Sequence, residues 1–177
     1  SMLIDEYFEQ IKKTKVGISI FSPPYANCFD YCEVYKLEFW MGNFVKDYDG
    51  FKFFRDMAMR SHVNSSFDHK IKNYNKDIDV IANTIATYNI WNKNIPDMLR
   101  GYFDDTHELL KRMKDIFVKD ASCYIVVANS GYKGILVPTD LLVADIAKSL
   151  GYEVEKIMFA RKIRSSSQQM KELNGKY

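Results

Sequence analysis

The chain has 177 residues, of which 47% are hydrophobic and 27% are charged, and its formal net charge at pH 7 is +2. This length is enough for one domain with a hydrophobic core, and the composition is that of an ordinary globular protein, which excludes a disordered or fibrous chain. The charge is nearly neutral, so binding to a polyanion would need a local basic patch, and no apolar run reaches the roughly 18 residues that a membrane-spanning helix needs.

The first half of the sequence predicts one strand among several helices. Hydrophobic periodicity favours helices over residues 3–13, 29–41 and 51–61, and a strand over residues 16–21. Apolar residues at steps of three and four from Ile71 to Tyr88 predict a further helix that is buried on one side. Pro96 then opens a long helix that is expected to reach Phe117, since a first turn tolerates proline.

The last third of the chain returns to strand-like patterns. Residues 122–128 form a nearly continuous apolar run, as expected of a strand buried on both faces. A helix capped by Thr139 or Asp140 and ended by Gly151 follows, and then a strand over about 152–162 and a basic, polar tail. This alternation predicts an α/β fold with a mostly parallel sheet flanked by helices, in one domain over residues 1–177 with a helical insertion at about 43–95.

Three cysteines and the start of the sequence favour a cytoplasmic protein. Cys28, Cys32 and Cys123 cannot all pair, which suits a reducing compartment, and no signal-peptide pattern opens the chain. Cys28 and Cys32 have helical spacing, but the histidines supply no pattern of further zinc ligands. We therefore expect plain thiols and no metal site.

The most informative stretch is Ser22-Pro23-Pro24-Tyr25, directly after the first predicted strand. Ligands of parallel sheets bind beyond the carboxyl ends of the strands, which is where this stretch falls. Proline fixes φ, lacks an N–H and holds the preceding residue extended, so the loop is expected to be rigid with unclaimed carbonyls. A hydroxyl, a free carbonyl and an aromatic ring at such a point could bind a flat molecule that carries an amino group. A proline-stiffened turn without a ligand is the alternative.

The same stretch resembles the catalytic motif of the amino-group DNA methyltransferases of restriction–modification systems, in which Asp, Asn or Ser precedes Pro-Pro-Tyr or Pro-Pro-Phe after the fourth strand. The likeness continues through Asn27 and Asp30-Tyr31 into the helix that ends YKLEFWMG. YIVVANSGYKGILVPTDLLVADIAKSLGY is similar to the family's fifth strand and following helix, and FARKIRSSSQQ to the next strand and its loop. The resemblance implies a partial Rossmann-like fold that uses S-adenosylmethionine (AdoMet).

The resemblance also implies roles for the motif residues Ser22, Pro23, Pro24 and Tyr25. The Ser22 hydroxyl and the Pro23 carbonyl would accept both hydrogens of an exocyclic amino group, which frees the nitrogen lone pair to attack the AdoMet methyl group in line. The base must be flipped out of the duplex, and Tyr25 would stack on its face. Serine at the first position favours cytosine N4 over adenine N6.

Further candidate residues belong to a base pocket and to a DNA-binding surface. Asn27, Phe29 and Tyr31 are expected in the wall of the pocket, although either aromatic ring could equally be core. Hydroxyls and amides beside arginines suit phosphate contacts. The expected DNA-binding residues, with a solvated tail as the alternative, are Arg161, Lys162, Arg164, Ser166 and Gln168.

The sequence departs from the family in the cofactor site. Family members bind AdoMet through Phe-x-Gly-x-Gly after the first strand, whereas no two of the eight glycines here are separated by a single residue. We therefore expect the catalytic half of a methyltransferase, inactive by itself, with the AdoMet loop in an upstream segment or a partner chain. The open edge of the first strand is expected to be covered by the N-terminal helix or by a second copy of the chain, as a homodimer.

Other classes of function stay open. A non-catalytic nucleic-acid-binding or partner module could keep this fold without a cofactor site. Within the enzyme class, an RNA methyltransferase is a further alternative, since related Pro-Pro-Tyr loops act on RNA. A Gly-x-Gly segment upstream or in a neighbouring gene would favour the enzyme.

Overall fold

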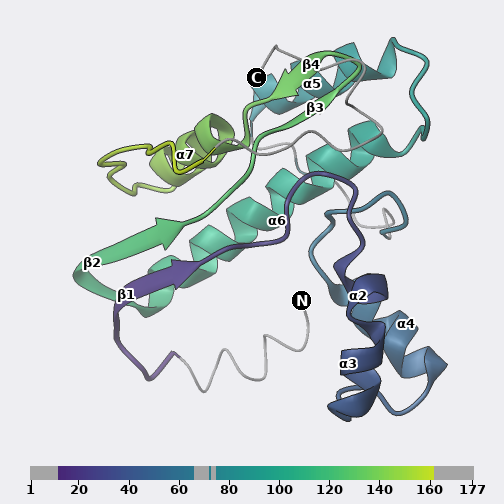
Figure 1. Cartoon of the computed structure of the whole chain (residues 1–177). Helices are drawn as coiled ribbons and strands as arrows, with labels where there is room; N and C mark the ends of the chain where they lie inside the picture. The colour runs from purple at the N-terminus through teal and green to yellow at the C-terminus, as the bar shows by residue number, and fades with distance from the viewer. Residues whose placement is uncertain (1–11, 66–71, 73–74, 162–177) are drawn as a thin grey trace.

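The computed structural model of the protein describes residues 12–65, 72 and 75–161. In this part of the chain, β1 (Val16–Phe21) pairs with β2 (Phe117–Ile125) in a parallel sheet, and β3 (Ser130–Tyr132) pairs with β4 (Ile135–Val137) in an antiparallel hairpin. The helices are α2 (Tyr31–Val34), α3 (Lys36–Met41), α4 (Tyr48–Met57), α5 (Lys76–Ala86), α6 (Ile95–Ile116) and α7 (Thr139–Ser149). The architecture is a mixed one of helices and a small parallel sheet, which is compatible with the predicted α/β class (Figure 1).

The parallel pair brings two distant loops together. Parallel strands need a long crossover connection, which here contains helices α2 to α6. Ile18 lies opposite Ser122 and Phe21 opposite Ile125, and the Val126 N–H donates to the Phe21 carbonyl at 2.9 Å. The carboxyl ends of β1 and β2 are therefore adjacent, so the loop that follows Phe21 lies beside the residues that follow Ile125.

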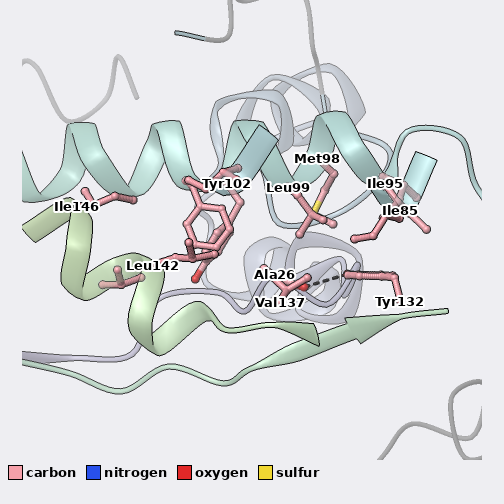
Figure 2. Packing of buried hydrophobic residues seen from close by; sticks show 14 of the residues in the cluster. Ala26, Ile85, Ile95, Met98, Leu99, Tyr102, Tyr132, Val137, Leu142 and Ile146 are labelled. Atoms are coloured by element: carbon pink, nitrogen blue, oxygen red, sulfur yellow. Dashed lines mark hydrogen bonds between the residues drawn. The ribbon is translucent and has the colours of Figure 1, made fainter. Parts of the chain in front are cut away.

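The core is built around the long α6. Its start carries proline in the first turn, as predicted, and its buried face includes Met98, Leu99 and Tyr102. Figure 2 shows these side chains packed against Ile85 of α5 and Leu142 of α7. Ile78 and Ile85 of the predicted stripe are buried in α5, whereas Tyr88 lies beyond the end of the helix and is 46% exposed. The N-cap Asn75 accepts from the Asp77 N–H. Ile71 and Tyr74 lie outside the described residues.

A second, smaller cluster joins α2, α3 and α4. Cys32, Val45 and Phe51 are buried in it, and Phe39 packs against Phe54 with ring centroids 4.7 Å apart. The predicted helix over 29–41 is interrupted at Tyr35, which ends α2 and precedes α3, and Gly42 ends α3 as expected. The helix predicted over 51–61 starts earlier, at Tyr48, because Asp47 caps it by accepting from the Gly50 N–H at 2.7 Å.

Two expectations about the last third are wrong, and one feature of it was not predicted. Residues 152–161 form no strand, since none of the described residues offers them a pairing partner, and Met158 and Phe159 are exposed. Helix α7 starts after Pro138 without a side-chain cap from Thr139 or Asp140, because the Thr139 hydroxyl donates back to the Val137 carbonyl instead. The hairpin of β3 and β4 was not predicted at all.

The sheet is not buried on both faces, contrary to the prediction for residues 122–128. Helix α6 and its neighbours cover the face of Phe21 and Ile125. On the opposite face, Ile20 of β1 is 72% exposed and its register partner Tyr124 is 50% exposed. The N-terminal helix that was expected to cover this region falls on residues 3–13, of which 3–11 lie outside the described part. In the described part of the chain, no helix has the length and apolar character required to cross a membrane.

Candidate active site

The Ser22-Pro23-Pro24-Tyr25 loop begins where β1 ends, at the carboxyl edge of the sheet. Ser22 is exposed, and its hydroxyl donates to the Val126 carbonyl at 3.1 Å. The Ser22 and Tyr25 hydroxyl oxygens lie 3.4 Å apart. A serine hydroxyl has one proton and two lone pairs, so an oxygen whose proton is directed at Val126 presents itself as an acceptor. Among the hydrogen bonds of the described residues, none uses the Pro23 carbonyl.

Two aromatic rings of the predicted pocket, Phe29 and Tyr31, pack on each other beside Tyr25 of the loop. The Tyr25 N–H donates to the Tyr31 hydroxyl at 3.4 Å, and the rings of Phe29 and Tyr31 meet edge to face at 4.7 Å. Phe29 is 44% exposed, whereas Tyr25 and Tyr31 are half-buried, and burial raises the pKa of Tyr31. Neutral, partly exposed rings at one edge of a sheet are suited to stacking on a flat ligand.

Asn27 has a local structural contact. Its side-chain oxygen accepts from the Phe29 N–H at 3.2 Å, and its own N–H donates to the Tyr25 carbonyl at 2.8 Å. These are the contacts of a tight turn, in which asparagine is favoured because its side chain mimics the backbone. Asn27 therefore shapes the loop, and its exposed side chain keeps the amide nitrogen and one lone pair of the oxygen for a ligand.

Sequence reasoning missed a buried tyrosine under the loop. Tyr132 of β3 donates its hydroxyl proton to the Ala26 carbonyl at 2.9 Å, and the Cys28 sulfur lies 3.3 Å from the same hydroxyl oxygen (Figure 2 shows the bond to Ala26). Burial raises the pKa of Cys28 to about 11, so the thiol keeps its proton at neutral pH. All three cysteines are free thiols, and no group of metal-ligating side chains is found within the described residues.

Asp30 connects the loop to helix α4. Its carboxylate caps α2 by accepting from the Glu33 N–H at 3.2 Å, and it accepts from Arg55 Nε of α4 at 2.9 Å. The buried His62 lies behind this pair, with its Nδ1 3.5 Å from the Asp30 carboxylate. Burial lowers the pKa of His62, although the Asp30 charge opposes the shift. The acid therefore anchors the end of the loop rather than facing a ligand.

A small apolar crevice lies beneath the loop. Pro23 and Phe21 line it together with residues of α6, β2 and α7, among them Leu110 and Val143. Its single polar side chain, Thr106, already donates to the Tyr102 carbonyl at 2.8 Å. The crevice has no groups that would read a base, so the ligand side of the loop is the exposed side of Ser22.

Of the predicted DNA-binding residues, the structure describes only Arg161. Arg161 is exposed and belongs to no helix or strand. The other four, which are Lys162, Arg164, Ser166 and Gln168, lie outside the described residues.

Comparison with known proteins gives one kind of relative. The type II methyltransferases M.AvaI of Nostoc sp. and of Anabaena variabilis are each 27% identical to this chain over 165 residues. The match covers 85% of this chain and 34% of each relative, so the chain spans about a third of the length of the curated relatives it matches. No protein-family model and no solved structure matches it. The chain is therefore similar to type II methyltransferases, which confirms the expected resemblance to restriction–modification methyltransferases at the level of the family.

Proposed function

We propose that this chain forms the base-binding side of a DNA methyltransferase active site, which acts on the exocyclic amino group of a flipped base, cytosine N4 in the first place. The observation that carries this proposal is the pair of acceptors at the carboxyl end of β1. The Ser22 oxygen has its proton directed at Val126, and the neighbouring Pro23 carbonyl takes no bond from the described residues.

Two acceptors suit the chemistry of an aromatic amine. The lone pair of such an amine is conjugated into the ring, and both hydrogens lie in the ring plane. Bonds from these hydrogens to Ser22 Oγ and to the Pro23 carbonyl oxygen would hold the amine in one orientation and stabilise the positive charge on nitrogen. That charge would arise as the methyl group leaves the sulfonium sulfur of the donor for the nitrogen, and it would end when the nitrogen sheds a proton. A serine whose proton is already placed on Val126 accepts without first having to turn.

The aromatic rings supply the second requirement, a place for a base outside the duplex. Tyr25 has its hydroxyl 3.4 Å from that of Ser22, Tyr31 accepts from the Tyr25 N–H, Phe29 packs on Tyr31, and all three rings have part of their surface exposed. Stacking on such rings offsets the stacking free energy that a base loses when it leaves the duplex. Such stacking does not depend on which base is bound. The choice between cytosine and adenine therefore rests on the acceptors, and serine favours cytosine by the family pattern.

The described residues do not fit AdoMet itself. Close approach of the backbone to a nucleotide cofactor uses glycines at short spacing after a strand. In the nearest pair here, Gly131 lies within β3 and Gly134 lies in the hairpin turn with a φ of 78°. We therefore assign to this chain only the binding and orientation of the base. The cofactor would be held by other residues of the protein or by a partner chain.

The test is methyl transfer from labelled AdoMet to duplex DNA by the full-length protein. Digestion to nucleosides then separates N4-methylcytosine from N6-methyladenine. Ser22→Ala should abolish most of the incorporation, and Ser149→Ala is its matched control, since the Ser149 hydroxyl also donates to a backbone carbonyl, that of Ile146, at 2.7 Å. Label in N6-methyladenine alone would overturn the cytosine assignment.

The missing glycine loop favours a second candidate, a non-catalytic module that binds nucleic acid or a partner. That module would bind DNA in the same way with and without Ser22, and it would incorporate no label. Transfer to RNA and not to DNA would instead support an RNA methyltransferase with the same loop.

A further inference from the structure

We propose that Tyr132 is a positioning residue, whose hydroxyl holds the Ser22–Tyr25 loop in the geometry that presents its two acceptors. Its consequence for catalysis rests on the proposed function. Tyr132 is 5% exposed and comes from the β3–β4 hairpin, far from the loop in sequence. The side chain therefore acts on the loop from below and cannot itself touch a base on the exposed side.

The contact is a chain of hydrogen bonds with a defined direction. The Tyr132 hydroxyl donates to the Ala26 carbonyl at 2.9 Å, which uses its only proton. The Cys28 thiol must then be the donor in its 3.3 Å contact with the Tyr132 oxygen. A thiol that stays protonated at neutral pH can do so, and successive bonds of this kind polarise and strengthen one another.

These bonds fix the loop at the residues that follow Tyr25. Ala26 is fully buried, so its carbonyl cannot find water if Tyr132 is removed. Cys28 has a φ of 64°, in the left-handed region that a non-glycine residue adopts rarely. Between them, the Asn27 N–H is bonded to the Tyr25 carbonyl at 2.8 Å. Release of Ala26 and Cys28 would therefore let Tyr25, and the acceptors before it, change position.

Tyr132→Phe tests this with little change of shape, because it removes the hydroxyl and keeps the buried ring. Tyr152→Phe is the matched control, since the Tyr152 hydroxyl also donates to a backbone carbonyl, that of Leu110, at 2.7 Å, and forms no hydrogen bond with residues 22–28. Cys28→Ala and Cys28→Ser form a second pair, of which only serine keeps a donor for the Tyr132 oxygen.

The first measurement is amide hydrogen exchange of the full-length protein without DNA or AdoMet. In Tyr132→Phe we expect faster exchange at Tyr25 and Asn27 than in wild type and in Tyr152→Phe, with α6 unchanged. Equal exchange at these two amides in both variants would overturn the proposal. Cys28→Ala should show a smaller increase in the same direction, and Cys28→Ser should restore the wild-type rate.

The second measurement is steady-state methyl transfer. We expect Tyr132→Phe to lower kcat roughly tenfold, the effect of one lost hydrogen bond on orientation, with KM for AdoMet unchanged. Wild-type kcat in Tyr132→Phe, or an equal loss in Tyr152→Phe, would overturn the positioning role. A wild-type protein that transfers no methyl group to any DNA would refute the proposed function, and the exchange measurement would still decide whether Tyr132 holds the loop.

Discussion

Replacement of Ser22 separates the chemistry of the loop from its stability. Both Ser22 and Val126 are exposed, so in Ser22→Ala water can take over the bond to the Val126 carbonyl. We therefore expect the free energy of unfolding to fall by no more than about 1 kcal/mol. The lost acceptor, in contrast, would face a nitrogen that becomes positively charged. Hydrogen bonds to charged groups contribute roughly 1.5–3 kcal/mol, which corresponds to a roughly 10- to 150-fold lower kcat.

The identity of the residue at position 22 sharpens this prediction. Asparagine can donate an amide proton to the Val126 carbonyl and accept with its oxygen, whereas an ionised aspartate can only accept and would lie against that carbonyl. Ser22→Asn should therefore retain more activity than Ser22→Asp at neutral pH. The assay is single-turnover methyl transfer with saturating DNA, and chemical denaturation checks that each variant is folded. A folded Ser22→Ala variant whose rate is within twofold of wild type would refute the acceptor role.

Three further outcomes are expected. Tyr25→Ala should weaken the binding of DNA with an abasic or mismatched target by roughly 1–3 kcal/mol, the contribution of one stacked base. The control Tyr88→Ala, at an exposed residue beyond the end of α5, should leave the affinity unchanged. Equal affinities of the two variants, measured by fluorescence anisotropy, would contradict this. Burial lowers the folded-state pKa of His62 and of His107, so the unfolded state takes up protons first as the pH falls below the usual histidine value of about 6.5. Stability to urea should therefore decrease from pH 7 to pH 5, and His62→Asn should flatten that slope; a slope unchanged by the substitution would exclude His62 as a cause. Calorimetric titration of residues 1–177 with AdoMet should show no micromolar binding, because the glycine pattern that approaches the cofactor is absent from these residues.

Local patterns predicted the elements that are long or strongly periodic. The strand over 16–21 and the long helix opened by Pro96 match β1 and α6 closely, since each has a sustained apolar period and a clear boundary signal. The position of Ser22 at a strand end followed from the same reasoning. The β3–β4 hairpin escaped prediction because each strand has only three residues, which is too short to display an alternation.

Long-range pairing decided the features that the sequence could not predict. Tyr152 and Val154 alternate as in a strand, but a strand also needs a hydrogen-bonded neighbour, and this depends on the rest of the sheet. The bond of Ser22 to Val126 spans 104 positions, and that of Tyr132 to Ala26 spans 106. Both depend on the register of β1 against β2 and on the placement of the hairpin, neither of which has a signature in local residue periodicity.

The open side of β1 bears directly on the proposed function. Parallel sheets are normally covered on both faces, yet the face of Ile18, Ile20 and Tyr124 is exposed in the described structure. Among the described strands β1 pairs with β2 alone, so its other edge has no described neighbour. A further parallel strand paired with that edge would have its carboxyl end beside Ser22, because all strands of a parallel sheet end at the same edge. Under the proposed function, the loop after such a strand is where the cofactor-binding residues would meet the Ser22 and Pro23 acceptors.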